Sequence, residues 1–230
     1  MRKILLIILI FLSCYVVYNV TNDDDIYFLA IGDFLAKGVN NHNHVDDGFF
    51  NHVVSYLDDQ DKLEGSNNSF TQKDMRITDL IRKIDYSEEM MIDNKTIAIN
   101  NLLHKADVIT VSVGMNEFYY KLFSNNNNIY YYASQMLEDM HELLDRINGY
   151  NHRKVIVLGY YNITSSNQDV FNYLNVRLEK MVVEEGFDFV DLDKLLDDKT
   201  KYFDNETNFY PNNAGYDKIS QIIVENIKNY

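Results

Sequence analysis

The sequence predicts an α/β fold in which one parallel sheet is buried between two layers of helices. Short apolar runs alternate along the chain with longer stretches that carry apolar residues at helical spacing. Most of the short runs are apolar at successive positions, as expected of strands that are covered on both faces. The chain has 230 residues, of which 46% are hydrophobic, and this suffices for one full-sized core. We therefore expect one three-layer α/β/α domain with about five parallel strands.

Four runs predict strands, and a weaker strand is expected near residues 69–71. The four are Ile26–Ile31, Val108–Val113, Val155–Leu158 and Phe187–Leu192. Five other stretches predict amphipathic helices. They are Gly48–Leu57, Arg76–Ile84, Ile129–Ile147, Val170–Glu185 and Ala214–Lys228. Because ligands of such folds bind beyond the carboxyl ends of the strands, the loops there and the loop before the last helix should carry any chemistry.

The charge of the chain argues against nucleic acid as a partner. Asp and Glu number 35 against 21 Lys and Arg, which gives a net charge of -14. The sequence has no basic block, so its field would repel a phosphate backbone.

The first 21 residues predict a membrane anchor or signal segment rather than part of the fold. Residues 1–3, Met-Arg-Lys, precede an apolar run over 4–20 that is just long enough to span a bilayer. No A-x-A-like cleavage site follows the run. Basic residues before it and three aspartates at 23–25 orient it with its N-terminus inside the cell. We expect a single-pass protein of the cell membrane whose domain, residues 22–230, lies outside the cytoplasm.

The only cysteine, Cys14, lies within this run, so no intramolecular disulfide can form. Its setting, FLSC, loosely resembles a bacterial lipoprotein cleavage box. Lipidation of Cys14 is the alternative to a plain signal-anchor, and both place the domain on the same side of the membrane.

Four stretches resemble, in order, the sequence blocks of the SGNH (GDSL) hydrolases, a family of esterases and lipases. AIGDFLAKG (30–38) resembles the Gly-Asp-Ser-Leu block after the first strand. KDMRITDLIRKI (73–84) lies where the family has its glycine block, and VSVGMNEF (111–118) resembles the Gly-x-Asn-Asp block. FYPNNAGYDKIS (209–220) resembles the block that opens the C-terminal helix with Asp-x-x-His-Pro-Asn. The resemblance implies the flavodoxin-like architecture of that family.

The resemblance also implies where a catalytic triad would lie, and all three positions are changed. In the family a serine is the nucleophile, a histidine its base, and an aspartate three residues earlier orients the histidine. Here the nucleophile position is Phe34, the base position is Tyr210 and the aspartate position is Thr207. Phenylalanine cannot attack a carbonyl, and a phenol is a poor base at neutral pH.

The oxyanion hole implied by the resemblance is partly changed as well. Asp74 replaces the glycine of the second block, and a carboxylate there would oppose a developing oxyanion. Gly114 and Asn116 of the third block are kept, as are Gly32 and Asp33 in the first turn. The candidate binding cleft consists of retained and changed positions together: Gly32, Asp33, Phe34, Asp74, Gly114, Asn116 and Tyr210.

We therefore expect no serine-dependent hydrolysis, because loss of even one triad member costs about 10⁴- to 10⁶-fold in rate. The leading hypothesis is a membrane-tethered pseudoenzyme whose cleft binds an envelope glycan or acyl chain. Two alternatives stay open: an ester hydrolase with a different set of catalytic residues, and a structural or partner-binding envelope protein. Phe34 either fills the vacated pocket or lines a groove, and Tyr210 either binds a ligand or packs at the helix entry.

Other side chains give weaker signals. His42 and His44, or Ser165 and Ser166, belong to loops that border the cleft, but no Ser-His pair follows from the sequence. His42 and His44 are separated by one residue, and Asp46 and Asp47 follow them. Side chains in this arrangement can chelate a metal, although such loops are usually solvated. Neither a metal nor a cofactor is predicted. Arg76 and Asp79, at the start of a predicted helix, are expected to have a structural role.

Overall fold

The computed structural model describes residues 25–40, 42, 44–45, 48–92, 94–124, 128–150, 154–164, 166–205 and 208–228. The predicted anchor, with Cys14, lies outside these residues. Among the helices of the described part, none is long and apolar enough to cross a bilayer.

A five-stranded parallel sheet forms the centre of the fold, with the strand order β2-β1-β5-β6-β7. Its strands are β1 (Ile26–Gly32), β2 (Leu63–Asn67), β5 (Val108–Ser112), β6 (Lys154–Leu158) and β7 (Asp188–Val190). β5 is buried along its whole length, and all of β1 after Ile26 is buried. This burial is why both strands are continuous apolar runs rather than alternating patterns.

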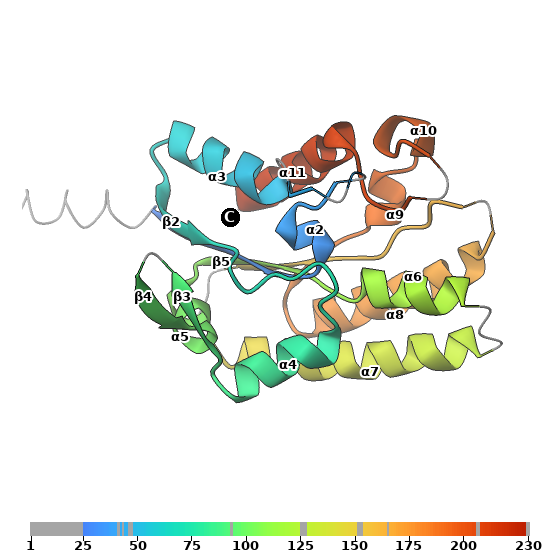
Figure 1. Cartoon of the computed structure of the whole chain (residues 1–230), viewed down its shortest axis with the longest axis horizontal. Coiled ribbons are helices and arrows are strands. Elements are labelled where there is room, and N and C mark those ends of the chain that lie inside the picture. Colours follow the sequence, from blue (N-terminus) through green and yellow to red (C-terminus); the bar gives the residue numbers. More distant parts are fainter. Residues whose placement is uncertain are drawn as a thin grey trace, which may run out of the picture.

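Helices cover both faces of the sheet (Figure 1). One face carries α3 (Phe49–Asp59) and α11 (Asn213–Lys228), and the other carries α4 (Ile77–Asp85), α5 (Ile99–Lys105), α7 (Ile129–Asn148) and α8 (Gln168–Glu184). Four further helices, α2 (Phe34–Lys37), α6 (Met115–Phe123), α9 (Leu192–Leu195) and α10 (Lys199–Tyr202), lie toward the carboxyl ends of the strands. The predicted three-layer α/β/α arrangement is confirmed.

The second strand differs from its predicted position. It spans Leu63–Asn67, and Thr71 of the expected segment forms only an isolated parallel bridge with Gly32. The sequence LEGSN has one large apolar residue because β2 is an edge strand. A Cβ at Gly65 would lie 2.9 Å from the Tyr27 ring, so packing against that ring favours glycine there.

A small antiparallel hairpin was not predicted. It consists of β3 (Glu89–Ile92) and β4 (Lys95–Ala98), and it lies between α4 and α5. Its strands are short and only partly buried, so they lack the long apolar run that identifies the central strands.

Candidate functional site

The turn after β1 positions the first motif. Gly32 has φ +136, and a Cβ there would lie 1.8 Å from the carbonyl oxygen of Ser112 in the neighbouring strand β5, so only glycine fits. Asp33 caps α2: its Oδ1 accepts from Leu35 N at 3.3 Å, and its Oδ2 accepts from Met115 N at 3.0 Å. The same carboxyl group therefore connects the first residues of α2 and α6.

Asp33 is fully buried, and this governs its protonation. Burial raises the pKa of its carboxyl to about 8, although backbone N–H groups of Leu35, Asn116 and Met115 oppose the rise. The residue is thus a structural connector, with no access to solvent or ligand.

Phe34, at the nucleophile position, is the first residue of α2 and is fully buried. Its ring packs edge-on against Tyr210, with centroids 4.8 Å apart and planes at 86°, and against Phe209 at 5.4 Å and 68°. The positions that the resemblance assigns to nucleophile and base are therefore in direct contact through two aromatic rings. Such pairs contribute about 0.5–1.5 kcal/mol each beyond their buried area.

The aromatic packing continues from this pair to the surface. Phe209 stacks on Tyr119 of α6 with centroids 4.5 Å apart and planes at 12°, and Tyr119 stacks on Phe123 at 5.4 Å and 24°. The Tyr119 hydroxyl donates to the carbonyl of Tyr161 at 2.8 Å, which joins α6 to the segment after β6. Phe123 is 55% exposed. Of the side chains in this column, sequence reasoning singled out only Phe34 and Tyr210.

Two positions that the resemblance assigns to the oxyanion hole, Asp74 and Asn116, are joined by a hydrogen bond. Asn116 Nδ2 donates to Asp74 Oδ1 at 2.7 Å, so the amide that would bind an oxyanion is engaged by a carboxylate. Gly114 precedes α6 with φ +96, where a Cβ would lie 2.9 Å from the Tyr160 hydroxyl oxygen. The glycine is thus required for the backbone geometry and for close packing.

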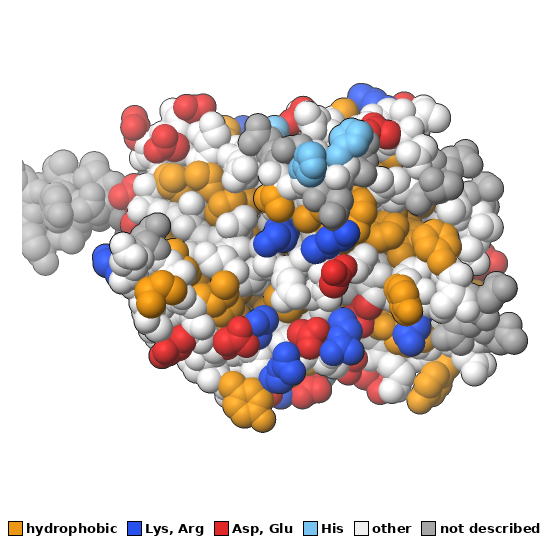
Figure 2. All heavy atoms as spheres, viewed as in Figure 1, with side chains coloured by type: hydrophobic (Ala, Val, Ile, Leu, Met, Phe, Trp, Pro, Cys, Tyr) orange, Lys and Arg blue, Asp and Glu red, His pale blue; other side chains and the backbone are white. Residues whose placement is uncertain are grey.

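An open groove of about 1060 Å³ runs beside these residues. α6, α7, the segment before α4 and the residues Phe209 and Tyr210 line it, and Asp74, Asn116 and Tyr120 are among the lining side chains. Figure 2 shows hydrophobic side chains at the surface near α6, beside an area of mixed acidic and basic side chains. Phe34 does not line the groove, so the filled nucleophile pocket and the open groove are separate.

One wall of the groove is held by Glu117. Its carboxylate accepts from Ile77 N at 3.2 Å and from the Tyr132 hydroxyl at 3.0 Å, which connects α6 to the start of α4 and to α7. Burial raises the pKa of Glu117, although these two hydrogen bonds oppose the rise. Lys121 also lines the groove, with its ammonium 5.3 Å from the centroid of the Tyr132 ring.

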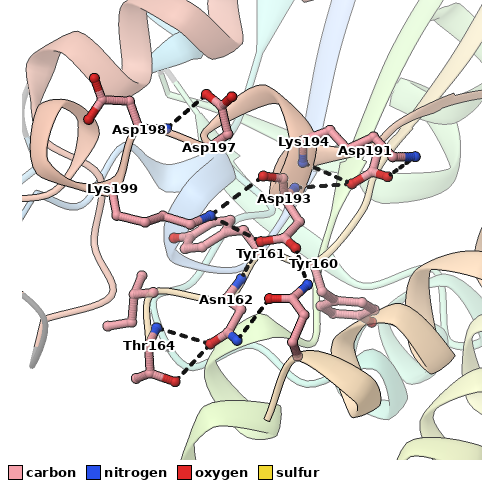
Figure 3. A network of polar contacts seen from close by, with 12 residues as sticks. Tyr160, Tyr161, Asn162, Thr164, Asp191, Asp193, Lys194, Asp197, Asp198 and Lys199 are labelled. Carbon is pink, nitrogen blue, oxygen red and sulfur yellow. Dashed lines mark hydrogen bonds and ion pairs between the residues drawn. The ribbon is translucent and has the colours of Figure 1, made fainter. Parts of the chain in front are cut away.

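A partly buried polar network fixes the segment after β6 (Figure 3). Asp193 in α9 accepts from Asn162 N at 2.9 Å, from Gln168 Nε2 at 2.6 Å and from Lys199 Nζ at 3.0 Å. Burial acts to raise the pKa of Asp193, but these donors together lower it. The Asn162 side chain in turn accepts from the Thr164 backbone and hydroxyl, both at 3.0 Å. This network was not predicted, because its members are separated by up to 37 residues.

Of the remaining candidates, Ser166 belongs to this network, since its carbonyl accepts from Asn162 Nδ2 at 2.8 Å. The backbone N–H groups of His42 and His44 both donate to Asn40 Oδ1 at 3.0 Å. Thr207, the aspartate position, is outside the described residues, as are Ser165, Asp46 and Asp47. Within the described ranges no group of three or more His, Cys, Asp or Glu side chains could hold a metal ion. At the start of α4, Arg76 Nε and Asp79 Oδ2 are 3.0 Å apart and form an ion pair. This contact agrees with the structural role expected of both residues.

No protein-family model and no curated protein sequence matches this chain. Solved structures do. An acetylxylan esterase from Geobacillus stearothermophilus, Axe2, superposes with a TM-score of 0.65 at 13% identity over 88% of this chain and 94% of the esterase. Catalytic mutants of that esterase replace a serine, an aspartate or a histidine by alanine. A lipase from a goat rumen metagenome superposes with a TM-score of 0.69 at 16% identity, over 87% of this chain and 96% of the lipase. This chain therefore has the three-layer α/β/α fold of the SGNH-type hydrolases, as its four motifs predicted.

Proposed function

We propose that this chain is a glycan-binding protein with the SGNH-hydrolase fold that has lost ester hydrolysis. The observation that carries the proposal is the contact of Phe34 with Tyr210, which fills the place of the nucleophile and its base with two packed rings. The Asn116 amide, bound to Asp74, supports the same conclusion, since an oxyanion would have to displace a carboxylate.

The open groove supports a binding role. Its lining combines aromatic rings such as Tyr120 and Tyr132 with amide and charged side chains such as Gln135 and Lys121. A sugar chain presents hydroxyl groups on its edges and apolar C–H faces, so it suits a surface of aromatic and polar groups. An acyl chain would need an enclosed, mainly apolar pocket. The likeness to an acetylxylan esterase and to a lipase is compatible with either ligand, and the groove favours the glycan.

The direction of β1 favours the same ligand. β1 begins at Ile26, and residues that line the groove, such as Asp74 and Asn116, follow the carboxyl ends of β2 and β5 at the opposite end of the sheet. We propose that residues 4–20 tether the protein to the cell membrane. A tether that precedes β1 would hold the groove away from the lipid surface and toward the glycans of the envelope.

Calorimetric titration of the purified full-length chain with neutral hexasaccharides, including that of N-acetylglucosamine, tests the binding role. Tyr120 lines the groove and is 72% exposed, so Tyr120→Ala should weaken binding about fivefold or more through the loss of a stacking surface. Tyr86→Ala is the matched control, because Tyr86 is 80% exposed at the end of α4 and outside the groove. Absence of binding to every oligosaccharide, or equal effects of the two variants, would contradict the proposal.

A further inference from the structure

The groove presents a carboxylate acceptor, Asp74, beside the side-chain amide of Asn116. The Asp74 carboxylate accepts a hydrogen bond from the Asn116 amide, with Oδ1 and Nδ2 2.7 Å apart. A carbonyl oxygen or an anion placed there would face a negative charge. A cation or a strong hydrogen-bond donor would be attracted.

The acceptors of this pair are available to a ligand. Asp74 is exposed and lines the groove, and none of the described Lys, Arg or His side chains forms an ion pair with it. Asn116 Nδ2 points to Asp74, and no hydrogen bond from a described residue reaches Asn116 Oδ1. A carboxylate and an amide oxygen side by side can share the three N–H donors of one ammonium group.

A cation already lies at the neighbouring ring. The ammonium of Lys73 is 5.3 Å from the centroid of Tyr210, within the range of a cation–π contact, and both residues line the groove. The half-buried Tyr210 ring is held by Phe34 and Phe209, so it forms a fixed surface for a positive charge. The net charge of -14 adds a long-range field that attracts cations.

We infer that Asp74, Asn116 and Tyr210 form a subsite for a primary ammonium group on the ligand, so that the preferred glycan contains amino sugars with free amines. This inference rests on the proposed glycan-binding function. In the absence of ligand the Lys73 ammonium lies over the Tyr210 ring of this subsite, and it moves away from the ring when the ligand's ammonium enters.

The test compares two hexasaccharides of equal length, one of glucosamine and one of N-acetylglucosamine, by calorimetry with the full-length chain at a pH where the amines are protonated. The free amine should give about tenfold tighter binding, equivalent to 1.4 kcal/mol. Asp74→Asn should reduce this preference to about threefold or less, since it removes the charge and keeps the shape. Asp58→Asn removes an equal charge from α3, outside the groove, and should leave the preference unchanged.

Lys73→Gln should have the opposite effect to Asp74→Asn on the preference for the free amine. It removes the competing ammonium, so it should tighten binding of the glucosamine hexasaccharide about threefold, with little effect on the acetylated one. Lys62→Gln, which removes an exposed lysine before β2, is its control. Equal affinities for the two sugars, or an unchanged preference in Asp74→Asn, would overturn the inference. If the acetylated sugar still binds in a Tyr120-dependent way, the proposed glycan-binding function stands without it.

Discussion

The ring of Phe34 meets the ring of Tyr210 edge-on, with their centroids 4.8 Å apart. By resemblance, these are the positions of a nucleophile and its base, so the two replacements are physically coupled. A serine at position 34 would leave a void beside Tyr210 and Phe209. A histidine at position 210 would present a smaller and more polar ring to Phe34.

The first prediction concerns stability. Phe34→Ala should lower the free energy of unfolding by about 3–5 kcal/mol, because it leaves a cavity inside the aromatic cluster. Phe123→Ala removes a ring at the exposed end of the same column and should cost about 1 kcal/mol or less. Urea denaturation followed by circular dichroism measures both changes. Similar losses in the two variants would show that the cluster does not depend on the buried ring.

The second prediction concerns restoration of chemistry. A variant with Phe34→Ser, Thr207→Asp, Tyr210→His and Asp74→Gly should gain hydrolysis of a short p-nitrophenyl ester, because it rebuilds the triad and frees the Asn116 amide. The same variant with alanine instead of serine at position 34 is the control and should show no gain. A folded quadruple variant that is no faster than this control would mean that the pocket cannot admit a substrate.

The third prediction concerns pH. Burial raises the pKa of Asp33 to about 8 from its ordinary value of 3.8, so the folded chain retains a proton that the unfolded chain releases between these values. This group's contribution makes the free energy of unfolding fall as pH rises from about 4 to about 8, by up to about 1.4 kcal/mol per pH unit, and then level out.

Asp33→Asn removes this titration. In urea denaturation series we expect the free energy of unfolding of the variant, minus that of the parent, to rise from acid toward alkaline pH, because only the parent is destabilised by ionisation. Other buried carboxyl groups, such as Glu117, titrate in both proteins and cancel in the comparison. A difference that stays constant from about pH 5 to pH 8 would contradict the assigned protonation of Asp33.

The sequence predicts the central strands well because they are buried on both faces, and the Gly32–Asp33 turn well because its backbone geometry excludes other residues. It misplaces β2, since an edge strand with Gly65 at its centre carries little apolar pattern. It identifies Asp74 and Asn116 separately, but their hydrogen bond joins residues 42 positions apart. The aromatic column through Tyr119 was not predicted for the same reason. Stacking between segments that are distant in the sequence produces no pattern of spacing within either segment.

The measurement that tests the central claim most directly is hydrolysis of a short p-nitrophenyl ester by the purified full-length chain. We predict a rate equal to that of the buffer alone, because neither Phe34 nor Tyr210 can perform the serine-triad steps and Asp74 engages the Asn116 amide. Saturable turnover that is abolished by Tyr210→Phe or by His44→Ala, with folding retained, would contradict the account and establish a hydrolase with a different set of catalytic residues.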